Sequence, residues 1–220
     1  LEVRQLQLAA ARRVFGTALG LCGGTVGSAT TAAPAPPTVE EAERQRQQHH
    51  CRAKIYRAYI ALEFQLGEIA RCRTLYAGYV ASDPSYCRAY MEYAQMEHTL
   101  HETARARAIL ELAVAQPVLD TPEKLWKFYI DLEVAGGDVP RARALYRRLL
   151  EQTQHVKVWL SYARFEHETA HNDANARAVL RDADACLRAA ADTPREQQQQ
   201  QREARALVAE AALSLERDIG

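Results

Sequence analysis

The sequence predicts an all-α protein in which helical hairpins stack into an α-α superhelix, or solenoid. One motif recurs about every 34 residues, and each copy holds two stretches whose apolar residues are three and four positions apart. Two helices per unit and a unit of this length are typical of solenoids. In such proteins each unit buries its apolar face against its neighbours rather than forming a core alone.

The clearest copy of the motif lies in residues 125–151. Trp126, Tyr129 and Glu133 are spaced by three and four residues, so they line one face of a helix. Two glycines end that helix. Asp138 then offers an N-cap for a second helix, which has a proline in its first turn and an apolar stripe between arginines. The segment therefore predicts a helical hairpin.

The same hairpin is predicted at three other places. Each copy has an aromatic residue, a tyrosine three positions later, a glutamate four positions after that, and a downstream arginine. The first position advances from residue 56 to 90, 126 and 159, which are steps of 34, 36 and 33 residues. The copies consist of Tyr56, Tyr59, Glu63 and Arg73; Tyr90, Tyr93, Glu97 and Arg107; Trp126, Tyr129, Glu133 and Arg143; and Trp159, Tyr162, Glu166 and Arg177.

The start of the chain shows part of the motif and then loses it. Glu2 and Arg12 have the ten-residue spacing of the first three glutamate–arginine pairs (the fourth has eleven), so residues 1–22 are predicted to be the end of a preceding repeat. Glu2 would end a first helix of that repeat. Residues 23–50 form a low-complexity insert, whose Gly/Ala/Thr/Pro-rich first half we expect to be disordered. Its charged, Gln-rich second half can extend the following helix backwards.

The rest of the chain divides into repeats and a tail. Residues 51–190 hold the four repeats, and residues 191–201 are predicted to be a Gln-rich linker. Residues 202–220 are predicted to form the first helix of a degenerate or truncated repeat, because Ala209 and Ala212 stand where the two aromatic residues would fall. Since the chain opens inside a repeat, we expect it to be a fragment of a longer protein.

Composition narrows the classes of function. The chain has 220 residues and a formal net charge of zero, which gives no special reason to expect nucleic acid as the main partner. No stretch approaches the ~20 apolar residues of a membrane span, and no secretory signal is visible. The odd number of cysteines and the lack of a CxxC pair favour reduced thiols inside the cell. The cysteines are Cys22, Cys51, Cys72, Cys87 and Cys186.

The recurring positions have a structural interpretation. Glutamate and arginine lie at similar heights on either side of each turn, so we expect an ion pair across each hairpin. The residue before the arginine is small, which lets helices approach closely: Ala11, Cys72, Ala106, Ala142 and Ala176. Three residues after the arginine stands a large apolar residue: Phe15, Tyr76, Leu110, Tyr146 or Leu180. We interpret all these positions as packing positions, and assign none to catalysis, a cofactor or a metal.

Two local patterns suggest other chemistry. His167 to His171 matches HExxH, a zinc-protease signature that requires both histidines on one continuous helix and a third ligand. No histidine follows His171, and the motif overlies the end of a predicted first helix, so the repeat accounts for it better. Basic residues also cluster on the second helices, where they could touch an RNA backbone. A solvated helix face is the simpler interpretation. The cluster comprises Arg105, Arg107, Arg141, Arg143, Arg147 and Arg148.

The motif also resembles a known repeat. Its W/Y-x-x-Y-x-x-x-E and A-R-x-hydrophobic-Y/F patterns resemble the half-a-TPR (HAT) repeat of RNA-processing proteins. Over residues 1–22 and 52–190 the chain resembles the Crooked neck family of pre-mRNA splicing factors, and departs from it at the insert and the Gln-rich tract. The similar runs are Ile55 to Ile60, Glu63 to Leu66, Arg71 to Arg73, Ala104 to Ile109, Gln116 to Asp120, Leu125 to Lys127, Leu145 to Leu150 and Thr153 to Trp159.

The resemblance implies a function as well as a fold. It implies a nuclear, non-catalytic scaffold of the spliceosome that binds other proteins of the Prp19-associated (NineTeen) complex, with RNA contact at most peripheral. Another HAT scaffold, such as the large subunit of the cleavage stimulation factor, is an alternative of the same class. The HExxH zinc metalloprotease is the alternative of a different class.

Overall fold

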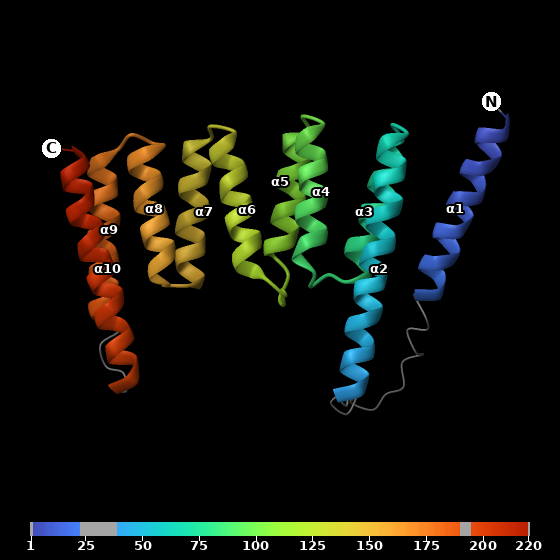
Figure 1. Cartoon of the computed structure of the whole chain (residues 1–220). Coiled ribbons are helices and arrows are strands. Elements are labelled where there is room, and N and C mark those ends of the chain that lie inside the picture. Colours follow the sequence, from blue (N-terminus) through green and yellow to red (C-terminus); the bar gives the residue numbers. More distant parts are fainter. Residues whose placement is uncertain (1, 23–38, 190–194, 220) are drawn as a thin grey trace. The chain divides into compact units, whose positions relative to one another are not determined.

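In the computed structural model, the described residues are 2–22, 39–189 and 195–219, and they form ten α-helices with no β-strand among them (Figure 1). The prediction of an all-α fold is confirmed. None of these helices combines the length and the apolar composition needed to cross a membrane. The chain falls into two compact units, residues 1–125 and residues 126–220, which are described separately below.

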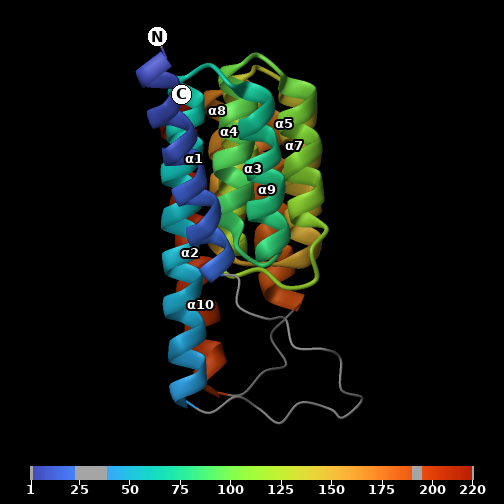
Figure 2. The ribbon, with the colours of Figure 1, turned by 90° about the vertical axis from the view of Figure 1, so that its right-hand side faces the viewer.

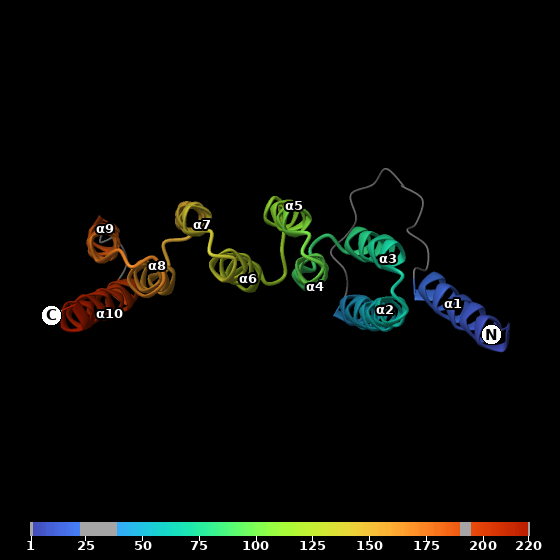
Figure 3. The same ribbon diagram turned by 90° about the horizontal axis from the view of Figure 1, so that it is seen from above.

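The first unit contains two hairpins and one further helix. α2 (Val39–Gln65) packs beside α3 (Ile69–Ser82), and α4 (Cys87–Thr99) packs beside α5 (Thr103–Val114). α1 (Glu2–Cys22) lies against α2. In the view from above, α2 and α4 occupy one layer, and α3 and α5 occupy the other (Figure 3).

The core of the first unit lies where α2, α3 and α4 meet. Ile60 comes from α2, Tyr79 from α3 and Met96 from α4, and each is at least nine-tenths buried. Cys72 is fully buried, and its thiol donates to the carbonyl of Ile60 at 3.8 Å. A small residue at this position allows α3 to approach α2 closely, as the sequence pattern predicts.

The second unit has the same construction. α6 (Pro122–Ala135), whose first residues belong to the first unit, is followed by α7 (Val139–Gln152). α8 (Val156–Glu168) and α9 (Asp173–Ala189) form the next hairpin, and α10 (Arg195–Ile219) packs against both of them. The first helices of the hairpins again share one layer and the second helices the other (Figure 3).

Each hairpin turn uses one residue in the left-handed region, two positions before the first residue of the second helix. The φ angles are 75° at Gly67, 61° at His101, 74° at Gly137 and 49° at His171. The amide of the following residue donates to the carbonyl of the motif glutamate, as from Asp138 to Glu133 at 3.0 Å. The turn therefore fixes the glutamate in the last turn of the first helix.

The structure differs from the predicted boundaries at both ends of the chain. Glu2 and Arg12 lie on one continuous helix, α1, so Glu2 does not end a separate first helix. The Gln-rich tract from Arg195 onwards belongs to α10 rather than to a linker. Straight-chain residues such as glutamine are good helix formers, which explains this difference.

The insert is helical in its charged half. α2 starts at Val39, and its N-terminal part projects beyond the C-terminal end of α3 (Figure 2), so it extends backwards as the sequence allows. The disorder that we expect for the first half of the insert falls on residues 23–38, which lie outside the described residues.

Candidate functional site: the junctions between hairpins

The motif glutamates are the buried charges of the described residues. Glu63, Glu97, Glu133 and Glu166 each have an exposed fraction of 0%. A buried carboxylate is costly unless it is paired and hydrogen-bonded. The partners of these glutamates therefore show what the motif does.

Three of these glutamates accept bidentate hydrogen bonds from an arginine on the second helix of the preceding repeat. Arg73 Nε and Nη2 donate to the two Glu97 oxygens at 2.7 and 2.8 Å. Arg143 donates to Glu166 in the same way, at 2.8 and 2.7 Å. Arg12 of α1 donates to Glu63 at 2.7 and 2.6 Å. We call each contact between a second helix and the next first helix a junction.

The predicted ion pair within each hairpin is wrong. Arg143 bonds Glu166 on α8, and not Glu133 on the first helix of its own hairpin. Successive repeats place their glutamates at similar heights, so the spacing along the chain cannot tell which of the two the arginine reaches. Arg143 reaches Glu166 because α7 packs against α8 and Arg143 lies on the side of α7 that faces α8. Within the hairpin, Glu133 instead has Arg141 Nε at 3.8 Å.

Stacked aromatic rings accompany the ion pairs in the same junctions. The ring of Tyr76 lies 4.9 Å from that of Tyr93, with an angle of 4° between their planes. The rings of Tyr146 and Tyr162 lie 4.8 Å apart at 12°. Phe15 and Tyr59 form the equivalent pair between α1 and α2, at 4.9 Å and 9°. The aromatic residue at the second position of the motif therefore packs in the junction, against a ring of the preceding helix.

The first aromatic position instead packs inside its own hairpin. Tyr56 stacks on Tyr79 at 4.9 Å, and the Arg148 guanidinium lies over the Trp126 ring at 5.5 Å. Trp126 is 3% exposed, which fits its interpretation as a packing position. Trp159 is less deeply buried than Trp126, and its buried indole N–H has no hydrogen-bond partner within the described part of the chain.

The junction environment shifts the pKa of its side chains. The hydrogen bonds that Arg73 donates to Glu97 raise the pKa of Arg73, and those that Arg143 donates to Glu166 raise the pKa of Arg143, although burial opposes both shifts. Burial raises the pKa of Tyr76 and of Tyr146 to about 12. At neutral pH the guanidinium groups are therefore charged and the phenol groups neutral, as both contacts require.

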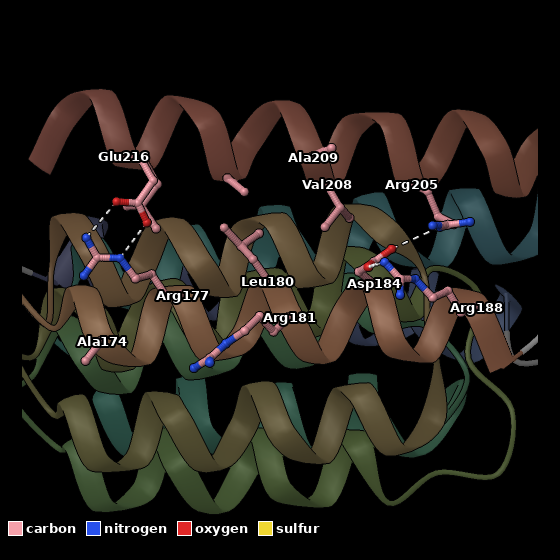
Figure 4. Close-up of a pocket in the computed structure, with 12 residues that line it drawn as sticks. Ala174, Arg177, Leu180, Arg181, Asp184, Arg188, Arg205, Val208, Ala209 and Glu216 are labelled. Carbon is pink, nitrogen blue, oxygen red and sulfur yellow. Dashed lines mark hydrogen bonds and ion pairs between the residues drawn. The ribbon is translucent and has the colours of Figure 1, made fainter. Parts of the chain in front are cut away.

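The junction between α9 and α10 keeps the ion pair but not the stacked rings. Arg177 donates to both oxygens of Glu216 at 2.6 and 2.8 Å (Figure 4). Glu216 is 55% exposed, unlike the fully buried motif glutamates. Leu180 and Ala212 occupy the ring positions, and a groove of about 580 Å³ lies between the two helices. The sequence predicts the missing aromatic residues but not the groove.

A residue outside the motif holds one repeat start in place. The carboxylate of Asp120 accepts the amide of Cys87 at 2.9 Å, and its own amide donates to the Ser85 carbonyl at 2.9 Å. Burial opposes ionisation of Asp120, but the bonds from Cys87 and Thr121 outweigh it, so the pKa is lowered. Sequence reasoning missed this contact, because Asp120 is 33 residues away from Cys87 along the chain.

The HExxH match does not have the geometry of a zinc site. α8 ends at Glu168, and His171 lies in the turn with a φ of 49°. The two histidines therefore do not share a helix. His167 Nδ1 instead lies 2.6 Å from Asp173 Oδ1, at the start of α9. The repeat interpretation of these residues accounts for each of these contacts.

The arginines of the predicted basic cluster mostly have protein contacts. Arg105 lies 3.9 Å from Glu102, Arg141 has Glu133 nearby, and Arg148 covers Trp126. Arg143 belongs to a junction. The cluster is therefore tied largely to packing and to local ion pairs.

Comparison with known proteins identifies the repeat and the relatives. Residues 138–168 match the HAT (Half-A-TPR) repeat, and this segment comprises α7 and α8 with the junction between them. Over 165 residues, 75% of this chain, it is 43% identical to pre-mRNA-splicing factor CLF1 of Paracoccidioides brasiliensis and covers 20% of that protein. It is 42% identical to Crooked neck-like protein 1 of Homo sapiens over the same length, covering 16% of it.

The chain belongs to the Crooked neck family of HAT-repeat proteins. It spans about a fifth of the length of the curated relatives that it matches. Its fold class is the α-α superhelix of HAT-type hairpins, as predicted. The matched HAT segment contains both contacts of one junction, Arg143 with Glu166 and Tyr146 with Tyr162.

Proposed function

We propose that the chain is part of a non-catalytic scaffold that acts in pre-mRNA splicing in the nucleus. Its relatives are named as pre-mRNA-splicing factors, and their names support this process. The single structural observation that supports a scaffold is the use of the motif side chains. In the junctions the motif arginines donate hydrogen bonds to the motif glutamates, and the motif tyrosines stack on neighbouring tyrosines.

A scaffold built in this way binds through the surfaces of several repeats. Helical repeats stack with small rotations, which produces extended surfaces rather than one deep pocket. We propose that these surfaces hold proteins of the Prp19-associated complex, with RNA contact at most peripheral. Partner affinity is then spread over several hairpins, so that no single substitution outside the core abolishes it.

The test of the splicing role uses the full-length parent protein. Its depletion from a nuclear extract should cause unspliced precursor RNA to accumulate, and adding the purified protein back should restore splicing. Mass spectrometry of the proteins that co-purify with it identifies the complex. Splicing at a normal rate after thorough depletion would contradict the proposal. Recovery of cleavage and polyadenylation factors in place of splicing factors would favour the cleavage stimulation alternative.

A variant of the HExxH residues separates the scaffold from the protease. His167→Ala combined with Glu168→Ala should leave the set of co-purifying proteins unchanged, since neither side chain belongs to a junction. Lys157→Ala, at an exposed position on α8, is the control. Stoichiometric zinc in the purified protein, together with peptidase activity that this double variant loses, would overturn the scaffold in favour of the enzyme.

A further inference from the structure

The α9–α10 junction has space that the other described junctions fill with aromatic rings. Stacked pairs occupy the α1–α2, α3–α4 and α7–α8 junctions. The α9–α10 junction has Leu180 opposite Ala212, and the space between the helices forms the groove of about 580 Å³. This volume lies within the range of about 300–1,000 Å³ that is typical of binding pockets. Leu180, Val208 and Leu215 give the groove an apolar floor.

Charged residues surround this apolar floor. The lining has four arginines and two carboxylates, an excess of two positive charges on a chain whose formal net charge is zero. Glu216 is bonded to Arg177, and Asp184 is shared between Arg188 and Arg205 (Figure 4). The exposed Arg181 forms no ion pair with any residue in the described part of the chain. The groove is therefore positive at its rim and apolar at its floor.

We propose that this groove binds an acidic segment of a partner protein that inserts one large aromatic side chain between Leu180 and Ala212. The inserted ring takes the place that stacked rings occupy in the other junctions, and a carboxylate beside it pairs with Arg181. Aromatic side chains contribute much of the energy of protein interfaces. The inference rests on the proposed function only in that the partner is a protein.

Single-stranded RNA fits this groove less well than an acidic peptide. Proteins that bind single strands stack the bases on aromatic side chains. The groove is lined by arginine, aliphatic and carboxylate side chains, and the described lining contains no aromatic ring. The arginines alone would attract a phosphate backbone without holding a base.

The binding test uses defined probes and the complete 220-residue chain. The main probe is a pool of short fluorescent peptides with a central tryptophan, flanking glutamates and randomised uncharged positions. Matched pools carry alanine in place of tryptophan, or lysine in place of glutamate, and oligouridine is the RNA probe. Fluorescence anisotropy should show binding of the main pool, and each change of the peptide should weaken it about tenfold or more.

Two substitutions locate the binding in the groove. Ala212→Tyr fills the space opposite Leu180 and should abolish binding, whereas Ala206→Tyr, on an exposed position of the same helix, should not. Arg181→Glu should weaken binding of the acidic pool and strengthen that of the lysine pool, whereas Lys157→Glu on α8 should do neither. Circular dichroism verifies that each variant is folded, and Arg181→Glu keeps the test valid if Ala212→Tyr fails to fold.

The outcomes separate this inference from the proposed function. Absence of binding by the main pool, binding unchanged by Ala212→Tyr and Arg181→Glu, or tighter binding of oligouridine would each overturn the groove as a peptide site. None of these results alters the splicing test by depletion. Conversely, normal splicing in a depleted extract would leave peptide binding in the groove unaffected.

Discussion

At the scale of single residues, the motif glutamate has two roles at once. Its backbone carbonyl accepts the amide that closes the hairpin turn, and its side chain receives the guanidinium of the preceding repeat. Arginine is favoured at this position because its planar guanidinium group can donate two hydrogen bonds to one carboxylate and retains its charge when partly buried. A lysine would leave one carboxylate oxygen without a bond.

Loss of one partner should be costly where the glutamate is fully buried. We expect Arg143→Ala to lower the free energy of unfolding by about 3 kcal/mol, because Glu166 is then left buried without its partner. Glu166→Ala should couple with it by more than about 0.5 kcal/mol in a double-mutant cycle, and Glu133→Ala should couple less. Urea unfolding measures the single variants and the two double variants that these cycles require. Arg177→Ala, at the exposed pair, is the control and should cost much less.

The left-handed histidine in the second hairpin turn should be suboptimal. A side chain in this conformation is strained by roughly 1–2 kcal/mol, whereas glycine adopts it freely. His101→Gly should therefore stabilise the protein by about 0.5–1 kcal/mol, after the greater chain entropy of glycine is subtracted. Gln95→Gly, at an exposed position inside α4, is the control and should destabilise by about 1 kcal/mol. Equal losses for both variants in thermal unfolding would contradict this expectation.

At the scale of helices, the junctions differ in what holds them. The α7–α8 junction has a buried carboxylate and stacked rings. The α9–α10 junction relies on exposed ion pairs around a groove. Exposed pairs are screened by salt and contribute little. α10 is therefore the helix of the second unit that we expect to open first.

Acid and salt should release α10 before the other helices of its unit. The hydrogen bond from Arg177 lowers the pKa of Glu216 below its ordinary value of 4.5, and that from Arg205 lowers the pKa of Asp184. A lowered pKa adds stability above the unfolded value, and that stability is lost as the pH falls through the folded value. Hydrogen exchange should show α10 amides losing protection below about pH 4.5 while α7 keeps it. Glu216→Gln should weaken this pH dependence, and synchronous loss in both helices would contradict it.

At the scale of the whole molecule, each unit has the same kind of core built from tyrosines. Tyr76 lies in the first unit and Tyr146 in the second, and burial raises the pKa of each to about 12. Both are nine-tenths buried or more and stack on a neighbouring ring. The two units should therefore respond alike to alkali.

Stability should fall between pH 10 and pH 12 in both units. A raised folded pKa means that the stabilisation is complete below the unfolded value of 10 and is lost as the pH rises through the folded value of about 12. Each tyrosine can contribute on the order of 2 kcal/mol to this loss. Tyr76→Phe and Tyr146→Phe should each flatten the fall of Tm over this range. Tyr86→Phe is the control, and an equal effect there would contradict the assignment.

The class of fold and the residues that build it can be predicted from the amino-acid sequence alone. Spacings of three and four residues place Trp126, Tyr129 and Glu133 on one helix face, and a period near 34 requires stacked hairpins. The small residues before each arginine also indicated close helix contacts, which the fully buried Cys72, Ala106, Ala142 and Ala176 show. These features depend on the spacing of residues along a helix and on the type of side chain at each position, and both can be read from the sequence.

Which of these residues contact each other depends on how the helices pack. Arg143 has a glutamate at a similar height on either side, and the packing of α7 against α8 selects Glu166. Asp120 reaches Cys87 only because the chain folds back on itself. The groove exists because Ala212 lies opposite Leu180, on a helix that starts 22 residues further along the chain than α9. The spacing of residues in the sequence determines on which face of a helix a side chain lies and how far along the helix axis. Which residue it contacts depends on how neighbouring helices are placed.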